Sequence, residues 1–321
     1  MRDHHIKATS ANMSSASLLA TERNTALDAI KGLLIFLVVF GHLIETNHHA
    51  LTEGIYHFIY IFHMPCFIFI SGMLAKADTA HILSRIKYCA LVYVLFNALY
   101  CAFGYYIVKE EIWLLTPYWI MWFLFSLACW NGLLFIFKYS PYLLIPAVFL
   151  GLGSGMIDNM NHELSFQRTF YFLPFFLAGF YISHYKSVFI KLSHSETIKM
   201  VLYGLSICLV TLTTCFHRFS LGTLYGSISY KMNDLDDASG MFERLLLMGN
   251  SVAMIYILFY LYGRYRITWL QRYGRASLGI YLLHGFLIWI VRDSLPSDPI
   301  LAIILSILIG AVCTHAISYV P

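Results

Sequence analysis

Titratable and hydroxyl side chains are concentrated in two long apolar stretches near the N-terminus, between Leu27 and Leu74. Each stretch is long enough to cross a lipid bilayer as a helix, which takes roughly 20 residues. Ionisable groups inside spanning helices are energetically costly, so their presence indicates a functional site. The side chains concerned are Asp28, Lys31, His42, Glu45, His57, His63 and Ser71.

Helical geometry places three of these side chains on one face of the first stretch. Lys31 and His42 are eleven residues apart, which at about 100° per residue is three turns plus roughly 20°. They are therefore separated by roughly 16 Å along one side of the helix. Glu45 follows His42 by three residues and lies within its reach. A histidine beside a carboxylate can act as a general base toward a hydroxyl group, and the lysine suits an anionic co-substrate. Alternatively, Lys31 extends to the lipid head groups and His42 bonds a neighbouring helix.

The second stretch carries His57 and His63, which are six residues apart and do not share a helix face. His63 precedes Pro65, where we expect a kink, and is the better candidate for a catalytic role. Gly72 permits close approach of another backbone. Ser71 has no catalytic-triad context, so we expect it to form hydrogen bonds or to pack near the cytoplasmic side.

Further candidates lie in later segments, most of them near a segment start and His284 in the middle of the ninth. Arg85 and Lys87 could bind phosphate groups, or could simply reflect the excess of positive charge in cytoplasmic loops. An aromatic cluster at residues 118–123 could line a substrate site or form a belt at the membrane interface. The candidates for substrate binding are Trp119, Trp122, Arg168 and His284.

The composition places these residues in a membrane protein. Of 321 residues, 59% are hydrophobic and only 12% are charged, and the mean hydropathy is +0.69. Soluble domains carry roughly 25% charged residues. Because the apolar segments are long and do not alternate, the spanning elements must be helices. We predict an all-α polytopic bundle of ten spanning helices at residues 26–46, 54–75, 88–108, 118–137, 141–157, 169–185, 199–216, 244–262, 276–292 and 299–320.

Loop charges predict the orientation of this bundle. A cytoplasmic N-terminus puts fourteen Lys and Arg residues on the cytoplasmic side and six on the external side, so both termini are predicted to be cytoplasmic. Residues 1–22 are polar and lack the apolar core of a signal peptide, so we expect a mobile tail before a transmembrane domain at 23–321. The longest connection, 217–243, is predicted to be external. It contains Asp234, Asp236 and Asp237 and is either functional or a solvated connector.

Several classes of site are not indicated by the sequence. The net charge is only +4 and no basic run is present, so nothing suggests a nucleic-acid partner. The seven cysteines occur singly, without the spacing of metal ligands. We therefore expect no metal site.

Five motifs, in order, make the chain resemble the acyltransferase 3 family of integral membrane acyltransferases, and most closely its fucose 4-O-acetylase-like branch. The resemblance covers about residues 23–320. Two departures fall in the third predicted helix: Val92 stands where the family often has proline, and the basic pair is Arg85-x-Lys87 instead of Arg-x-x-Arg. The motifs are RNTALDAIKGLLIFLVVFGH with Lys31 and His42 as the basic-residue–ten–His signature, IYIFHMPCFIFISGML, WFLFSLACW, FYFLPFFLAGF and GRASLGIYLLH.

The resemblance implies transfer of an acyl group, usually acetyl, from cytoplasmic acyl-CoA to a sugar hydroxyl. The acceptor would be an envelope or exported polysaccharide or a glycolipid, and the location a bacterial inner membrane. It also implies that His42 is the essential base and that Lys31, Arg85 and Lys87 bind the acetyl-CoA. We predict that Glu45 orients His42 and that Ser71 also contacts the acyl-CoA donor. The alternative function is a secondary transporter or proton-coupled flippase that uses the intramembrane His and Glu residues, although we see no inverted repeat. A membrane glycosyltransferase with a lipid-linked donor is a weaker alternative.

Overall fold

The computed structural model describes residues 25–109, 116–158, 160, 162–185, 195–265 and 267–319. Within these ranges the chain forms helices and turns and no strand, which confirms the predicted all-α bundle. The tail predicted at 1–22 lies outside the described residues.

Each predicted span coincides with a helix in the described part of the chain. Seven helices are long and apolar enough to cross a membrane, and the protein is a polytopic integral membrane protein. The other three, α5, α6 and α12, are shorter or carry more polar side chains. The helices are Thr25–Ile44, α2 (Ala50–Leu74), α3 (Thr79–Phe103), α4 (Trp122–Phe137), α5 (Leu144–Gly153), α6 (Phe166–His184), α8 (Glu196–Phe216), α10 (Asp237–Arg264), α12 (Ser277–Val291) and α13 (Pro299–Ile317).

The two helices that begin furthest ahead of their predicted boundaries, α3 and α10, are each capped by an aspartate. Asp78 accepts a hydrogen bond from the backbone N–H of His81, so α3 starts nine residues before the predicted boundary at 88. Asp236 accepts from the N–H groups of Ala238 and Ser239 and starts α10 at Asp237. A capping carboxylate satisfies N–H groups that the first helical turn leaves unpaired. The predicted loop at 217–243 is therefore shorter, and it contains the short helix α9 (Leu221–Tyr225).

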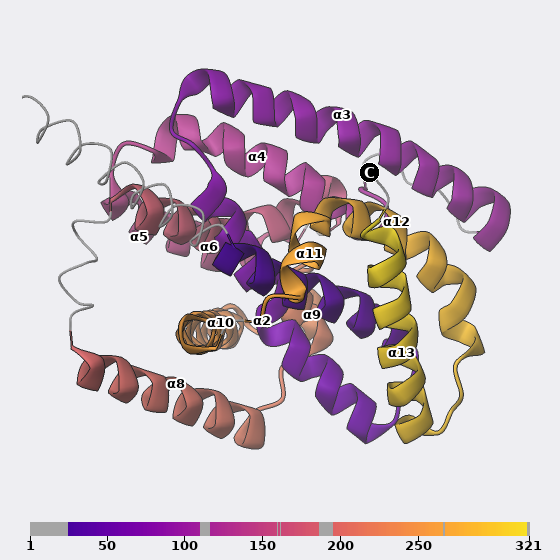
Figure 1. The fold of residues 1–321 in the computed structure, drawn as a ribbon. Helices are drawn as coiled ribbons and strands as arrows, with labels where there is room; N and C mark the ends of the chain where they lie inside the picture. Colours follow the sequence, from indigo (N-terminus) through magenta and orange to yellow (C-terminus); the bar gives the residue numbers. More distant parts are fainter. Residues whose placement is uncertain are drawn as a thin grey trace, which may run out of the picture.

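Close packing of α2 against α6 forms the centre of the bundle (Figure 1). A Cβ atom at Gly72 would clash with the carbonyl oxygen of Phe176, and one at Gly179 would clash with the carbonyl oxygen of Phe69. Glycine is therefore required at both positions, and the expected close approach at Gly72 is confirmed.

The N-terminal helix is held in the same way against α11 (Leu270–Arg275). Gly32 faces the carbonyl of Leu270, and Gly274 faces the carbonyl of Asp28, with no room for a Cβ at either. This contact fixes the start of the N-terminal helix, and His42 lies near the end of the same helix.

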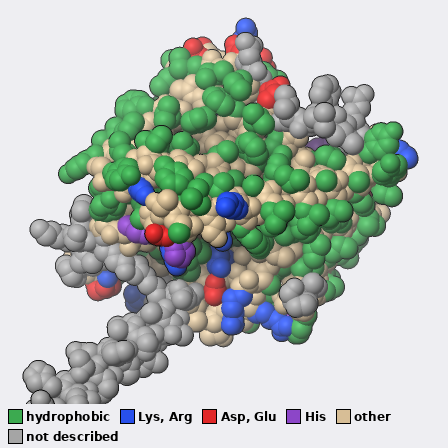
Figure 2. All heavy atoms as spheres, turned by 90° about the horizontal axis from the view of Figure 1, so that it is seen from above, with side chains coloured by type: hydrophobic (Ala, Val, Ile, Leu, Met, Phe, Trp, Pro, Cys, Tyr) green, Lys and Arg blue, Asp and Glu red, His purple; other side chains and the backbone are tan. Residues whose placement is uncertain are grey.

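The outer helices present apolar side chains to their surroundings. In Figure 1, α3 lies beside α4 at one edge of the bundle, and α8 lies beside α10 at the opposite edge. In the most apolar 18-residue stretch of the helical segment Thr79–Val108, which contains α3, only 11% of the residues are buried, and the same fraction holds for α8. Figure 2 shows hydrophobic side chains over most of one face, with the charged and His side chains in a few small groups. Such a surface is suited to contact with lipid tails.

Candidate functional site

His42 and Glu45 lie at the end of the N-terminal helix and are in contact. His42 Nδ1 is 3.1 Å from Glu45 Oε2, as the three-residue spacing predicts. The Tyr60 hydroxyl lies 3.4 Å from the same Nδ1, and the Trp119 ring lies 4.9 Å from the imidazole ring. With Nδ1–H donated to the carboxylate, the imidazole carries its lone pair on Nε2. This arrangement is suited to accepting a proton at Nε2.

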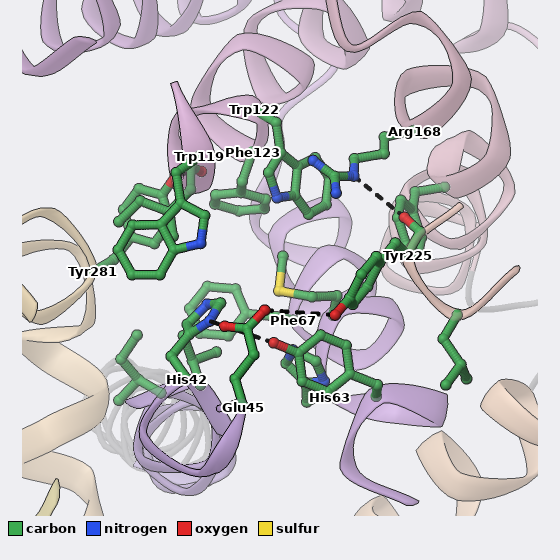
Figure 3. A pocket seen from close by; sticks show the side chains of 17 residues that line it. His42, Glu45, His63, Phe67, Trp119, Trp122, Phe123, Arg168, Tyr225 and Tyr281 are labelled. Atoms are coloured by element: carbon green, nitrogen blue, oxygen red, sulfur yellow. Dashed lines mark hydrogen bonds and ion pairs between the residues drawn. The ribbon is translucent and has the colours of Figure 1, made fainter. Parts of the chain in front are cut away.

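A cavity of about 170 Å³ opens beside this pair. Figure 3 shows His42 and Glu45 on one side of it, with Trp119, Trp122 and Arg168 facing them from the other. The cavity joins the N-terminal helix to α2, α4, α6, α9 and α12, so distant parts of the chain contribute to one site. Its lining residues are Ile35, Val38, His42, Glu45, Tyr60, His63, Met64, Phe67, Trp119, Ile120, Trp122, Phe123, Arg168, Phe172, Leu224, Tyr225 and Tyr281.

Two tyrosines bind the carboxylate that contacts His42. The Tyr56 hydroxyl donates to Glu45 Oε1 at 3.3 Å, and the Tyr225 hydroxyl donates to the same oxygen at 3.5 Å. The two hydroxyl oxygens are 2.5 Å apart. Burial, followed by the charge of Glu45, raises the pKa of Tyr225 to about 12, so this phenol remains protonated at neutral pH. Glu45 is thereby held between His42 and the loop that carries α9.

Arg168 is held in place by two contacts on the opposite side of the cavity. Its Nε donates to the carbonyl oxygen of Tyr225 at 3.3 Å, and its guanidinium lies 4.9 Å from the Trp122 ring (Figure 3). Arginine over an aromatic ring gains a cation–π interaction. The predicted substrate-binding residues Trp119, Trp122 and Arg168 are therefore brought together beside His42.

His63 and His284 flank the site with the same orientation. Each donates its Nδ1–H to backbone carbonyls of its own helix, His63 to Ile59 at 2.9 Å and His284 to Tyr281 at 2.8 Å. His63 lines the cavity, whereas the buried His284 lies just behind, its ring centre 5.8 Å from that of His42. Among the described residues, Nε2 of His284 has no hydrogen-bond partner. Both imidazoles therefore have their lone pair on Nε2.

The residues predicted to bind the donor are not among those that line this cavity. Lys31 forms an ion pair with Asp28 at 2.8 Å, and Ser71 Oγ donates to the carbonyl of Phe67 at 2.9 Å. Arg85 and Lys87 are exposed on α3. Their donor-binding roles stay predictions, as do the roles assigned to the cavity residues.

The backbone at Trp119 adopts an uncommon conformation. Its φ is 39°, in the left-handed region that L-residues adopt at a cost of roughly 1–2 kcal/mol. Strain of this kind is often found at functional sites. Here it directs the indole ring into the cavity, next to the His42 ring. Trp119 is therefore a cavity-lining residue.

Most of the aromatic residues that line the cavity are not among the predicted site residues. Tyr60, Phe67 and Tyr281 lie within or beside motifs that are mainly apolar, and nothing in their spacing separates them from lipid-facing residues. Tyr225 belongs to the long loop, and that loop's length was the one signal that could have found it. Among the described residues, no cluster of three or more His, Cys, Asp or Glu side chains could hold a metal ion.

The chain matches the acyltransferase 3 family, described as an acyltransferase domain, over residues 24–320. The chain belongs to this family. Nodulation protein NolL of Sinorhizobium fredii (strain NBRC 101917 / NGR234) is 27% identical over 221 residues, which is 66% of this chain and 51% of NolL. The chain thus matches about half the length of this relative. No solved structure matches.

Proposed function

We propose that this protein is a membrane O-acetyltransferase that moves an acetyl group from acetyl-CoA to a sugar hydroxyl. Family membership supports an acyltransferase, and the observation that carries the finer proposal is the contact between His42 Nδ1 and Glu45 beside a cavity. The proposed acceptor is an envelope or exported polysaccharide, or a lipid-linked glycan, at a bacterial inner membrane.

The shape of the cavity supports entry of the thioester from the predicted cytoplasmic side. Its lining extends along the N-terminal helix from Glu45 to Ile35, which is only four residues from Lys31. Ligand sites for whole cofactors usually measure about 300–1,000 Å³, so a cavity of 170 Å³ accommodates only the reacting end. The nucleotide would bind outside it, where Lys31, Arg85 and Lys87 are the predicted phosphate ligands.

The proposed reaction needs one base and one leaving group. His42 Nε2 removes the proton from the sugar hydroxyl while its oxygen attacks the thioester carbonyl carbon. The C–S bond breaks, the acetyl group forms an ester with the sugar, and the CoA thiolate takes a proton from the His42 imidazolium. Glu45 stabilises that imidazolium through the Nδ1–H bond, and general-base catalysis of this kind contributes about 10²–10⁴-fold. We assign to Arg168, which lines the same cavity, the stabilisation of negative charge on the carbonyl oxygen.

The test compares surface glycans from cells that lack the gene and carry the wild type, His42→Ala or His315→Ala. His315 is a matched control because it is an exposed histidine on α13 and does not line the cavity. We expect glycan O-acetylation with the wild type and His315→Ala and none with His42→Ala. Equal acetylation in all strains, together with protein-dependent transport of a solute, would instead support the transporter alternative.

A further inference from the structure

A second cavity of about 600 Å³ lies on the predicted external side of Glu45. It shares Glu45 and Tyr225 with the His42 cavity, so the two spaces meet at these side chains. Its volume is within the range of about 300–1,000 Å³ typical of ligand sites. It is lined by Ile44, Glu45, Asn47, His48, Glu53, Tyr56, His57, Arg218, Phe219, Ser220, Leu221, Tyr225, Asn233, Leu235 and Glu243.

The boundary between the two cavities is a set of hydrogen-bonded side chains. Glu45 Oε2 contacts His42 on the side of the first cavity. Glu45 Oε1 accepts hydrogen bonds from the hydroxyls of Tyr56 and Tyr225 on the side of the second cavity. Figure 3 shows Glu45 between His42 and Tyr225. A hydroxyl that displaced one of these tyrosine donors would approach the base directly.

The wall of the external cavity offers many hydrogen-bonding groups held in fixed positions. Asn233 Oδ1 accepts from Ser220 Oγ at 3.0 Å, and Glu243 Oε2 accepts from Thr223 Oγ1 at 3.1 Å. Tyr56 and Phe219 contribute aromatic side chains to the same lining. Rings with polar groups between them suit a polyhydroxylated ligand, which presents apolar C–H faces and many hydroxyl groups.

The charges of the wall disfavour an anionic ligand. Three carboxylates line it, from Glu45, Glu53 and Glu243. The guanidinium of Arg218 is already paired with Glu53, at 2.6 Å between Nη2 and Oε2. Among the described residues that line the cavity, no second arginine is present to offset these carboxylates, so a uronate would lose affinity through like-charge repulsion.

We infer that this external cavity is the acceptor subsite and binds a neutral sugar, whose hydroxyl reaches His42 past Tyr56 and Tyr225. The inference rests on the proposed function and adds the position and the charge class of the acceptor. Leu221 in α9 lines the cavity and has no part in the contacts to Glu45.

The experiment uses purified full-length protein with acetyl-CoA and measures CoA release with and without methyl glucoside or methyl glucuronide. In Leu221→Trp, which fills the cavity, we expect the KM for methyl glucoside to rise at least about tenfold. The KM for acetyl-CoA and the acceptor-free CoA release are expected to stay within about twofold. Met232→Trp is the matched control, because Met232 is exposed on the same loop and does not line the cavity. The wild type is expected to use the glucoside in preference to the glucuronide.

A labelling experiment covers the case in which Leu221→Trp does not fold. Leu221→Cys is labelled with a maleimide above the wild-type background, and methyl glucoside, but not acetyl-CoA, is expected to slow the labelling. An unchanged glucoside KM in folded Leu221→Trp, equal use of the glucuronide, or no protection of Leu221→Cys would overturn the inference. The proposed function would instead be contradicted if neither sugar increased CoA release by the wild-type protein and the protein acetylated no glycan in cells.

Discussion

At the scale of single residues, the site depends on which nitrogen of each imidazole carries a proton. His42, His63 and His284 all use Nδ1 for an anchoring hydrogen bond, but only His42 is anchored by a carboxylate. A carboxylate stabilises the imidazolium that forms when the base takes a proton, whereas a backbone carbonyl does so less. This difference favours His42 over the other two as the base.

Glu45→Gln tests this role of the carboxylate. When the new amide oxygen faces Nδ1–H and the amide NH2 faces the hydroxyls of Tyr56 and Tyr225, the tautomer of His42 is retained while the negative charge is lost. We expect kcat for acetyl transfer to fall by about 10–100-fold, less than the 10²–10⁴-fold loss expected for His42→Gln. The KM for acetyl-CoA is expected to be unchanged. Wild-type kcat in Glu45→Gln would show that Glu45 only positions the imidazole.

At the scale of elements, two pairs of glycines decide how the helices of the site meet. Gly72 and Gly179 bring the backbones of α2 and α6 together, while Gly32 and Gly274 do so for the N-terminal helix and α11. The first contact positions His63 on α2 relative to Arg168 on α6. The family motifs that looked merely apolar therefore contain the residues that set helix spacing.

Gly72→Ala is expected to destabilise the protein because the new methyl group meets the Phe176 carbonyl. Overpacking of this kind costs about 1–3 kcal/mol, and a backbone obstacle places it toward the upper end. Gly204→Ala on α8 is the control, since nothing lies within 4 Å of a Cβ there. That change is expected to be neutral or stabilising by up to about 1 kcal/mol. Thermal unfolding in detergent measures both, and equal stability of the two variants would contradict the packing argument.

At the scale of the whole molecule, Arg244 holds the loop at residues 217–236 against the bundle. This buried guanidinium on α10 donates to the carbonyl of Gly151 at 3.1 Å, to Gln167 Oε1 at 3.2 Å and to the carbonyl of Ile228 at 3.0 Å. The Tyr230 ring lies 4.7 Å from it. The loop held in this way carries Tyr225, so Arg244 stabilises a wall of both cavities from a distance.

Arg244→Met should therefore destabilise the fold and expose the loop. It leaves several buried acceptors without a donor, at about 1–3 kcal/mol each, so we expect a loss of roughly 3 kcal/mol or more. Limited proteolysis is expected to cleave within residues 217–236 faster than in the wild type. Arg218→Met is the control, because its ion pair with Glu53 is exposed and such pairs are worth about 0–1 kcal/mol. Similar stability and cleavage in both variants would rule out this role for Arg244.

The sequence was sufficient for the helices and for the His42–Glu45 contact. A segment of about 20 apolar residues can satisfy its backbone in lipid only as a helix, and the three-residue spacing alone places Glu45 beside His42. Helix ends were less predictable, because Asp78 and Asp236 start α3 and α10 earlier than hydropathy indicates. A polar capping residue extends a helix without changing its apolar content.

What only the tertiary structure decided is which other elements meet at His42. Tyr225, Arg168, Trp119 and Tyr281 come from four distant segments, and their convergence depends on helix packing through glycines and on the loop held by Arg244. Local periodicity describes one helix face at a time and contains no information about its partner across the bundle. For the same reason, the sequence does not predict the second cavity, although it shows that the loop lining this cavity is unusually long.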